Sequence, residues 1–446
     1  MAIGAVNPWP AAKLPRGPAA LLAALHFRAP RLDLLSRLND GEWRAAVDFS
    51  DRSLLTLALR RAMRNELPAW LRDRTDRDAA KNLHRLQRAE ELYRELDGQL
   101  RSAGIEYLAL KGLTQCPAYG MPAELRVQFD VDLFVPPATV NRAGEEMPAL
   151  GFRPIEELER LPTDHLPTFI RQGAWEWRGD VFDPEMPLSV ELHFQFWNER
   201  LERLRVPDIA SFWDRRTLRR VAGIEMPVLC AADGLGYTAL HLLRHVLRGS
   251  ARPYHIYELA GFLEGHRSDE SFWREWRELH SPEFRHLQAV MFRLAAEWFG
   301  CELGTVADEE IANLRPATRA WFEDFALSPA SGIFYAQKDE LWLHLSLVDS
   351  WRDQWAVARL RLLPVNAPGP VDVNRTDEVL NWRERLRRRC RYLAYVGTRL
   401  WRHAAALPHA ARMGIRWWGR SRPGPDLPKP AERPAFFKGP SPPSET

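Results

Sequence analysis

Two aspartates separated by a single residue, Asp130 and Asp132, stand in the stretch RVQFDVDLFVPP, residues 126–137. Apolar residues alternate with them, and this alternation predicts a half-buried β-strand. Side chains two apart in a strand point the same way, so both carboxylates should lie on the face away from the core. Like charges about 7 Å apart repel unless a cation lies nearby. Two interpretations follow: solvated aspartates at an exposed edge, or a site for a divalent metal ion.

A second strand repeats this pattern in SVELHF, residues 189–194, where Glu191 and His193 would share the outer face. If the two strands are neighbours, three carboxylates converge. Such a cluster suits two Mg²⁺ ions about 3.5–4 Å apart, which together clamp the attacking and leaving oxygens of a phosphoryl displacement. From the residues alone both interpretations stay open. In the second, Asp130, Asp132 and Glu191 are catalytic and metal-binding residues, with two Mg²⁺ ions as the cofactor.

The elements that would position these residues indicate an α+β fold. Strand patterns gather in the middle of the chain, at IEYLALKG (105–112), 126–135, AWEWRGDVF (174–182) and LSVELHFQF (188–196). Helical periodicity dominates before residue 104, and after residue 231 it predicts helices at 232–249, 254–264, 270–299, 307–327, 338–363 and 376–405. We expect a small mixed β-sheet core flanked by helical N- and C-terminal regions.

These patterns divide the chain into five segments. They are a helical N-terminal region (1–104), an α/β core (105–230), a helical domain that completes a cleft (231–330), an Arg-rich helical region (331–420) and a tail (421–446). The tail contains eight prolines in 26 residues, a composition typical of disorder.

Composition narrows the class of protein. The 446 residues are 46% hydrophobic and 27% charged, as in globular proteins, and the net charge of +3 does not argue for a nucleic-acid partner. No apolar run reaches the ~18–20 residues that span a membrane. The four cysteines are far apart and form no Cys-x-x-Cys pair, which predicts a reducing compartment and no cysteine-based zinc site. We predict a cytoplasmic protein and interpret PAALLAALHF near the N-terminus as a core helix rather than a signal peptide.

Taken in order, LALKG, LRVQFDVDLFV and SVELHF resemble the uncharacterised bacterial nucleotidyltransferase family, a branch of the DNA polymerase beta-type nucleotidyltransferase superfamily. The stretch LHLLRHVLRG followed by YHIYELAGFL is similar to the later part of that family. The resemblance implies Mg²⁺-dependent transfer of a nucleoside monophosphate from an NTP to a hydroxyl. The acceptor stays unidentified and is expected to be a small molecule, a peptide or a sugar.

The resemblance also implies roles for single residues. Lys111 and the backbone of Gly112 would meet the triphosphate, since glycine permits close approach and lysine supplies a point charge. Arg126, four residues before the first aspartate, would steady a phosphate or a carboxylate, and His193 would line the nucleotide site. Glu191 would accept the proton of the attacking hydroxyl.

Three positions depart from the family pattern. The chain has Lys111-Gly112-Leu113 where the superfamily commonly has Gly-Ser, Phe129 where a glycine is usual, and Glu191 where the third acid is often Asp. These departures keep open an alternative, a catalytically inactive nucleotidyltransferase-fold binding protein. In the active interpretation, Asp132→Asn is expected to abolish transfer and to leave the melting temperature unchanged or raised, because repulsion is relieved.

Histidines His241 and His245 lie four residues apart and share one helix face. No glutamate completes a His-Glu-x-x-His motif and no third ligand is evident, so a packed or site-wall role is favoured over zinc. The family resemblance implies a helix that flanks the nucleotide cleft. We place Glu258 in the same wall.

From Arg385 to Arg422 the chain has 11 arginines and no acidic residue. An apolar stripe runs through this segment at Leu386, Cys390, Leu393, Val396 and Leu400. The stripe favours a helix that packs on the protein and leaves its arginine face in solvent. A membrane surface and a nucleic-acid backbone are the alternatives.

Overall fold

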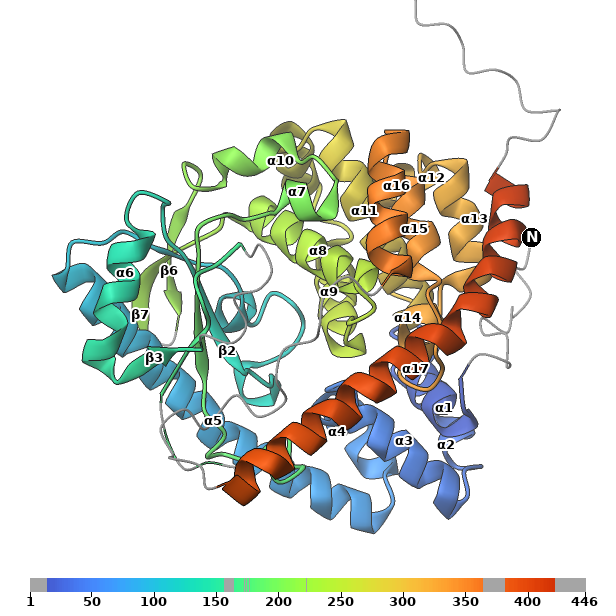
Figure 1. The fold of residues 1–446 in the computed structure, drawn as a ribbon, viewed down its shortest axis with the longest axis horizontal. Coiled ribbons are helices and arrows are strands. Elements are labelled where there is room, and N and C mark those ends of the chain that lie inside the picture. The colour runs from blue at the N-terminus through green and yellow to red at the C-terminus, as the bar shows by residue number, and fades with distance from the viewer. Residues whose placement is uncertain are drawn as a thin grey trace, which may run out of the picture.

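The computed structural model describes residues 14–155, 164–171, 173, 175, 177–221, 223–363 and 382–421. A seven-stranded mixed sheet lies on one side of the molecule and helices make up the rest (Figure 1). The α+β prediction, with helical regions before and after the sheet, is confirmed. Apart from Ser421, the tail predicted to be disordered lies outside the described residues.

The sheet has the strand order β3-β4-β5-β2-β1-β7-β6. Its strands are β1 (Leu108–Ala109), β2 (Asp130–Phe134), β3 (Phe152–Pro154), β4 (Phe169–Arg171), β5 (Ser189–His193), β6 (Thr217–Val221) and β7 (Ile224–Val228). The pairs β2–β5 and β1–β7 are parallel, and the other neighbours are antiparallel. Strands β2 and β5 therefore lie side by side and run in the same direction.

Three of the four predicted strands correspond to β1, β2 and β5, and the fourth, at 174–182, was wrong. Among its described residues no strand forms, and β4, a few residues earlier, pairs with β5 instead. Local contacts hold this stretch as a loop, since Trp175 Nε1 donates to Asp183 and the Phe182 amide donates to Asp180. Polar side chains that bond to nearby backbone compete with a strand ladder.

Seventeen helices are formed by the described residues. They are α1 (Arg16–Ala24), α2 (Leu32–Leu35), α3 (Asp40–Arg52), α4 (Thr56–Met63), α5 (Ala69–Ser102), α6 (Val140–Glu146), α7 (Glu199–Glu202), α8 (Ala231–Leu247), α9 (Pro253–His266), α10 (Glu270–Leu279), α11 (Pro282–Phe299), α12 (Thr305–Ala312), α13 (Pro316–Phe325), α14 (Ser328–Ser331), α15 (Glu340–Leu347), α16 (Trp351–Leu362) and α17 (Trp382–Ser421). The single helix predicted over 270–299 is divided because Ser281 caps α11 and Pro282 occupies its first turn.

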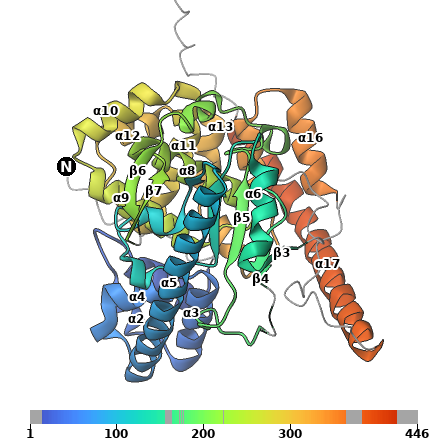
Figure 2. The same ribbon diagram turned by 90° about the vertical axis from the view of Figure 1, so that its left-hand side faces the viewer.

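Two hydrophobic cores organise these elements. The first lies between the sheet and α5 and includes Leu96, Leu100, Val131 and Leu133. Figure 2 shows α5 running along the sheet. The second is larger and joins α1 to α4 with α8 to α16. Helices from both ends of the chain thus share one core. Helix α5 contributes Leu71 to this core and packs on the sheet through its C-terminal half. The boundaries predicted for the five segments stay a prediction.

Helix α17 packs through a face other than the predicted one. Leu386, Leu393 and Leu400 share a face because they are seven residues apart, and they are 54%, 59% and 49% exposed. Of the predicted stripe only Val396 is half-buried, whereas Ala410, on another face, is buried. The expectation that this stripe packs on the protein is therefore wrong. No described helix has the length and apolarity needed to cross a membrane.

Candidate active site

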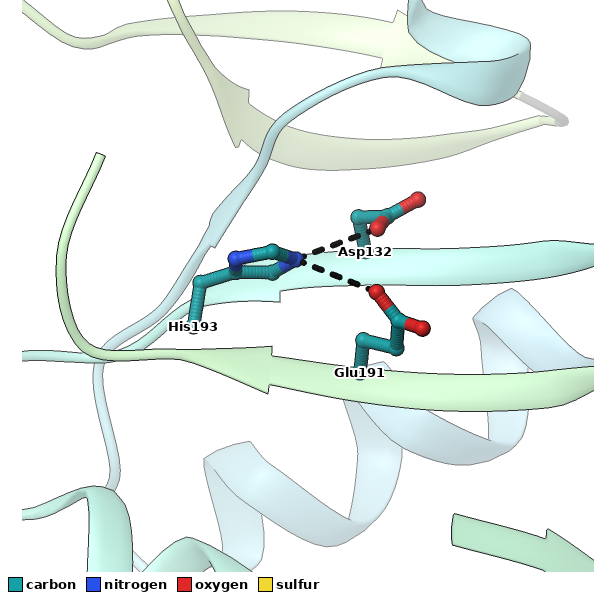
Figure 3. Close-up of side chains that lie close together, drawn as sticks. All are labelled: Asp132, Glu191 and His193. Carbon is teal, nitrogen blue, oxygen red and sulfur yellow. Dashed lines mark hydrogen bonds and ion pairs between the residues drawn. The ribbon is translucent and has the colours of Figure 1, made fainter. Parts of the chain in front are cut away.

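The two acid-bearing strands are neighbours, which was the condition for their carboxylates to converge. In the parallel pair β2–β5, Asp132 lies directly opposite Glu191. Ligand atoms of Asp132, Glu191 and His193 all lie within 4.8 Å of one another (Figure 3). The Asp132 side chain is 1% exposed and that of Glu191 is 24% exposed. A buried carboxylate and a half-buried one therefore face each other beside an imidazole.

His193 lies between the two carboxylates. Its Nε2 atom is 3.1 Å from Asp132 Oδ1 and 3.5 Å from Glu191 Oε2. Burial opposes protonation of this imidazole, but the hydrogen bonds to both carboxylates outweigh it and raise the pKa of His193 to about 9. The protonated ring in turn helps to lower the pKa of Glu191 to about 2 against the effects of burial. At neutral pH the imidazole of His193 and the carboxylate of Glu191 are therefore both charged.

Lys111 supplies a second cation to the cluster. Its Nζ atom is 3.4 Å from Asp130 Oδ2 and 3.2 Å from Asp132 Oδ2. Burial alone would lower the pKa of Lys111, but the neighbouring carboxylates, Asp130 first among them, raise it above its ordinary value. The repulsion expected between the two aspartates is thus offset by an ammonium group that lies between them.

The cluster fits a divalent cation on two observations. Asp132 Oδ2 is buried and has no hydrogen-bond partner among the described residues, although Lys111 forms an ion pair with it. The same atoms already accommodate a cation, since an ammonium group lies between Asp130 and Asp132. Carboxylate oxygens suit Mg²⁺ and Mn²⁺, and an imidazole adds a ligand that transition metals prefer. Asp130 is not part of the three-residue group, which is the one potential metal cluster found among the described residues.

A pocket of about 310 Å³ opens beside this cluster. It lies between the β2 region, with the turn Gly112–Gln115, and the helices α8 and α9. Its lining includes Lys111, Gly112, Gln115, Arg126, Phe129, Asp130, Tyr237, Thr238, His241, His245, Ser250, Arg252, His255 and Glu258. His241, His245 and Glu258, which we predicted to form a wall of the nucleotide cleft, all line this pocket. Lys111 and Asp130 connect the pocket to the buried carboxylates.

Gly112 is held in a conformation that favours glycine. Its φ is +76°, and an added Cβ would lie 2.8 Å from Gln128 Nε2 and 3.0 Å from the Tyr93 hydroxyl. Both contacts are closer than a side chain tolerates, so the backbone here has room only for a hydrogen. A glycine at the edge of the pocket permits the close backbone approach predicted for a phosphate.

Arg126 lines the pocket but is already paired. Its Nε atom donates to Glu258 Oε1 at 2.7 Å, and one Nη donates to Gln115 Oε1 at 2.9 Å. Burial would raise the pKa of Glu258, but Arg126 and a hydrogen bond from His255 hold it below its ordinary range. This buried ion pair joins the strand region to α9. Arg126 was predicted to steady either a phosphate or a carboxylate, and in the structure it contacts the carboxylate of Glu258.

The histidines of the opposite wall are neutral. Burial lowers the pKa of His245 to about 2 and that of His241 well below its ordinary value, with Lys111 and Arg244 contributing. Their Nε2 atoms lie 3.1 Å apart, and His245 Nδ1 is 3.1 Å from the Ser250 hydroxyl. Among the described residues no third ligand joins them into a metal site.

Sequence reasoning did not identify the residues behind the cluster. Gln128 donates to the Asp130 carbonyl at 2.9 Å, and Asp164 Oδ2 lies 3.8 Å from His193 Nδ1 while it also pairs with Arg244. Arg244 stands between the two histidines of LHLLRHV, so its helix position was visible. Its partner Asp164 follows a stretch without a recognisable pattern, and the contact depends on the tertiary fold.

The α+β fold and the pairing of the two acid-bearing strands are consistent with a nucleotidyltransferase. Residues 40–300 match the family of uncharacterised nucleotidyltransferases, and the chain belongs to that family. Neither a curated protein nor a solved structure matches the chain.

Proposed function

We propose that the protein transfers a nucleoside monophosphate from an NTP to a hydroxyl of an acceptor and releases pyrophosphate. The observation that supports this most directly is the pairing of Asp132 with Glu191 across β2 and β5, beside a pocket lined by Lys111, Gly112 and Asp130. Family membership supports an NTP as the donor.

Asp132 and Glu191 would hold a divalent ion, with Asp130 adding oxygen ligands at the mouth of the pocket. When bound, Mg²⁺ supplies Lewis-acid stabilisation of the charge on the attacking and leaving oxygens. We propose that two ions bind here and that both are Mg²⁺.

Residues of the chain would bind the phosphates, accept the proton and orient the carboxylates. Lys111 exchanges its ion pairs with the aspartates for the triphosphate once other cations neutralise the carboxylates. The backbone at Gly112 approaches the phosphates because no side chain intervenes. Glu191 accepts the proton of the attacking hydroxyl, and His193 orients both carboxylates through its ring nitrogen.

Label transfer tests this proposal. The protein is incubated with each α-³²P-labelled NTP, Mg²⁺ and cell extract, and acceptor-bound label is separated from free nucleotide. We expect transfer from the wild-type protein that is lost in Asp132→Asn and Glu191→Gln. Transfer retained in both variants would overturn the assignment of the site.

We propose a second function for α17, the attachment of the protein to an anionic membrane surface. The same attachment is part of the alternative in which the protein is a catalytically inactive binding protein. Its exposed stripe of Leu386, Leu393 and Leu400 is accompanied by exposed Trp382 and Trp401. The helix carries eleven arginines against one acidic residue. An apolar stripe beside a basic face is the pattern of helices that lie in the interface of anionic lipids.

Vesicle pelleting tests the second function. We expect the protein to pellet with vesicles of phosphatidylcholine and phosphatidylserine, and less with phosphatidylcholine alone or at high salt. Leu386→Glu with Leu393→Glu should abolish pelleting, whereas Ala394→Glu with Ala405→Glu, exposed positions on another face with the same charge change, should weaken it only modestly. Equal loss in both pairs, or no pelleting of the wild-type protein, would contradict membrane attachment.

A further inference from the structure

A second cavity, of about 940 Å³, lies between α17, α14 to α16 and the loop before α9. The positive side chains in its lining are Arg52, Arg248, Arg252, Lys338, Arg361, Arg399 and Arg402. Glu340 is the only carboxylate that lines it among the described residues. Burial raises the pKa of Glu340 to about 7, so even this charge is partly lost at neutral pH. We call this cavity the basic groove.

The basic groove adjoins the nucleotide pocket. Ser250 and Arg252 line both cavities, so the loop between α8 and α9 separates them by little more than its own side chains. The Arg252 guanidinium lies over the ring of Phe129, 5.3 Å from the centroid of that ring. Phe129 directly precedes Asp130 in the sequence. A molecule in the groove could therefore extend a hydroxyl toward the carboxylate cluster.

The protein compensates only part of the positive charge of the groove, because Arg52 pairs with Asp48 and Arg248 pairs with Glu202. Arg361 Nε is buried and has no hydrogen-bond partner among the described residues, and no ion pair forms there between a carboxylate and Lys338 or Arg361. Burial lowers the pKa values of Lys338 and Arg361. At Lys338 the charge of Arg361 adds to this effect, whereas at Arg361 the carboxylate of Glu202 opposes it and Arg248 adds to it. Bringing an anion into the groove would relieve this repulsion.

We propose that the basic groove binds the acceptor of the transfer reaction and that the acceptor carries a phosphate group. This inference rests on the proposed function. Arginine and lysine together favour phosphate, since the guanidinium fork matches its oxygens and the ammonium adds a point charge. The volume lies within the range of small-molecule sites.

In the reaction, the acceptor hydroxyl oxygen forms a bond to the α-phosphorus of the NTP. The bond between that phosphorus and the oxygen bridging to the β-phosphate breaks, and pyrophosphate leaves with the bonding electrons. The hydroxyl proton passes to Glu191. The phosphate of the acceptor stays in the groove and takes no part in the chemistry.

The experiment uses a groove variant that combines Lys338→Gln and Arg361→Gln. The matched control combines Arg44→Gln and Arg77→Gln, two exposed positions outside the groove and outside α17. The anion site is measured with tungstate, a phosphate mimic located by its anomalous signal in crystals. NTP binding and label transfer in extract are measured on the same proteins. We expect tungstate in the groove of the wild-type and matched proteins, and none in the groove variant.

The groove variant should lose transfer at least tenfold while its NTP affinity stays within twofold of the wild type. Label should be found in small products that carry the acceptor's own phosphate in addition to the transferred one. These products should be in the aqueous phase for a soluble acceptor or in the organic phase for a lipid phosphate. Label in acid-precipitable RNA or protein, unchanged transfer in the variant, or no tungstate in the groove would overturn the inference. Absent NTP binding in the wild-type protein, with tungstate still in the groove, would instead overturn the proposed function.

Discussion

Asp132 and Glu191 lie directly opposite each other on parallel strands, and the Nε2 atom of His193 lies within 3.5 Å of both carboxylates. Together with Lys111, whose ammonium lies 3.2 Å from Asp132, this arrangement places two cations around one almost fully buried carboxylate. With Asp130 included, three carboxylates face two cations, so the cluster keeps one formal negative charge before any metal ion binds. Its members depend on one another, and removal of one should affect the rest.

Asp132→Asn should abolish transfer and also destabilise the protein in the absence of metal. The sequence alone suggested relief of repulsion, but the structure reverses the expected sign because the variant leaves Lys111 and His193 without their shared partner. Removing one member of a buried ion pair costs about 3–5 kcal/mol. Urea unfolding in the presence of EDTA measures the change, and a free energy of unfolding equal to or above that of the wild type would contradict this arrangement.

The stability of the metal-free protein should depend on pH through His193. Its pKa is about 9 in the folded protein against 6.5 ordinarily, so its contribution is complete below about pH 6.5 and is lost as the pH rises through 9. The raised pKa corresponds to roughly 3 kcal/mol. Urea titrations with EDTA at pH 6.5 and 9.5 measure this fall. In His193→Gln the difference between the two pH values should shrink, and an unchanged difference would contradict the assignment.

The paired strands β2 and β5 show which features of the site could be predicted from the sequence. Alternation of apolar and acidic residues correctly placed Asp132 and Glu191 on strands, because a period of two is a local property of the chain. That these strands are neighbours is a tertiary fact, which family resemblance suggested and the sheet order confirms. The ion pairs of Lys111 and His193 with the acids were not predicted, since their formation depends on the angle at which separate elements meet.

The buried pair of Arg126 and Glu258 gives a prediction about stability and binding together. Glu258→Gln should destabilise the protein by about 3–5 kcal/mol, because it leaves a buried guanidinium unpaired. The double variant Arg126→Met with Glu258→Leu should recover much of that loss, since two apolar groups need no partner. Urea unfolding of the three proteins checks this expectation, and equal destabilisation in the single and double variants would contradict it.

The same double variant separates the two roles predicted for Arg126. If Arg126 also contacts the triphosphate, the double variant will bind NTP more weakly despite its recovered stability. Unchanged NTP affinity would restrict Arg126 to its contact with Glu258.

Gly112→Ala should destabilise the protein and weaken NTP binding. Its positive φ costs an alanine about 1–3 kcal/mol, and the added Cβ meets the side chains of Gln128 and Tyr93. Gly98→Ala is the matched control, because Gly98 is exposed within α5 and its added Cβ would meet no atom within 4 Å. That variant should gain up to about 1 kcal/mol. Thermal unfolding of both variants measures the difference, and a neutral Gly112→Ala would contradict the tight approach seen here.

Helix α17 shows where periodicity alone misleads. The spacing of Leu386, Leu393 and Leu400 correctly predicted a helix with an apolar stripe, but the stripe faces solvent while another face packs on the protein. A stripe of leucines has the same pattern whether it contacts the core, a partner or lipid. What covers it is decided outside the helix, so sequence periodicity could not distinguish these outcomes.

The most direct measurement of the central claim is equilibrium binding of each labelled NTP in Mg²⁺ and in EDTA. It is made with the wild-type protein, Glu191→Gln and the matched control Glu185→Gln, an exposed loop residue. We predict binding that requires Mg²⁺, falls at least tenfold in Glu191→Gln and is unchanged in Glu185→Gln. Binding that is equally strong in EDTA, or unaffected by Glu191→Gln, would contradict the claim that this carboxylate cluster is a metal-dependent nucleotide site.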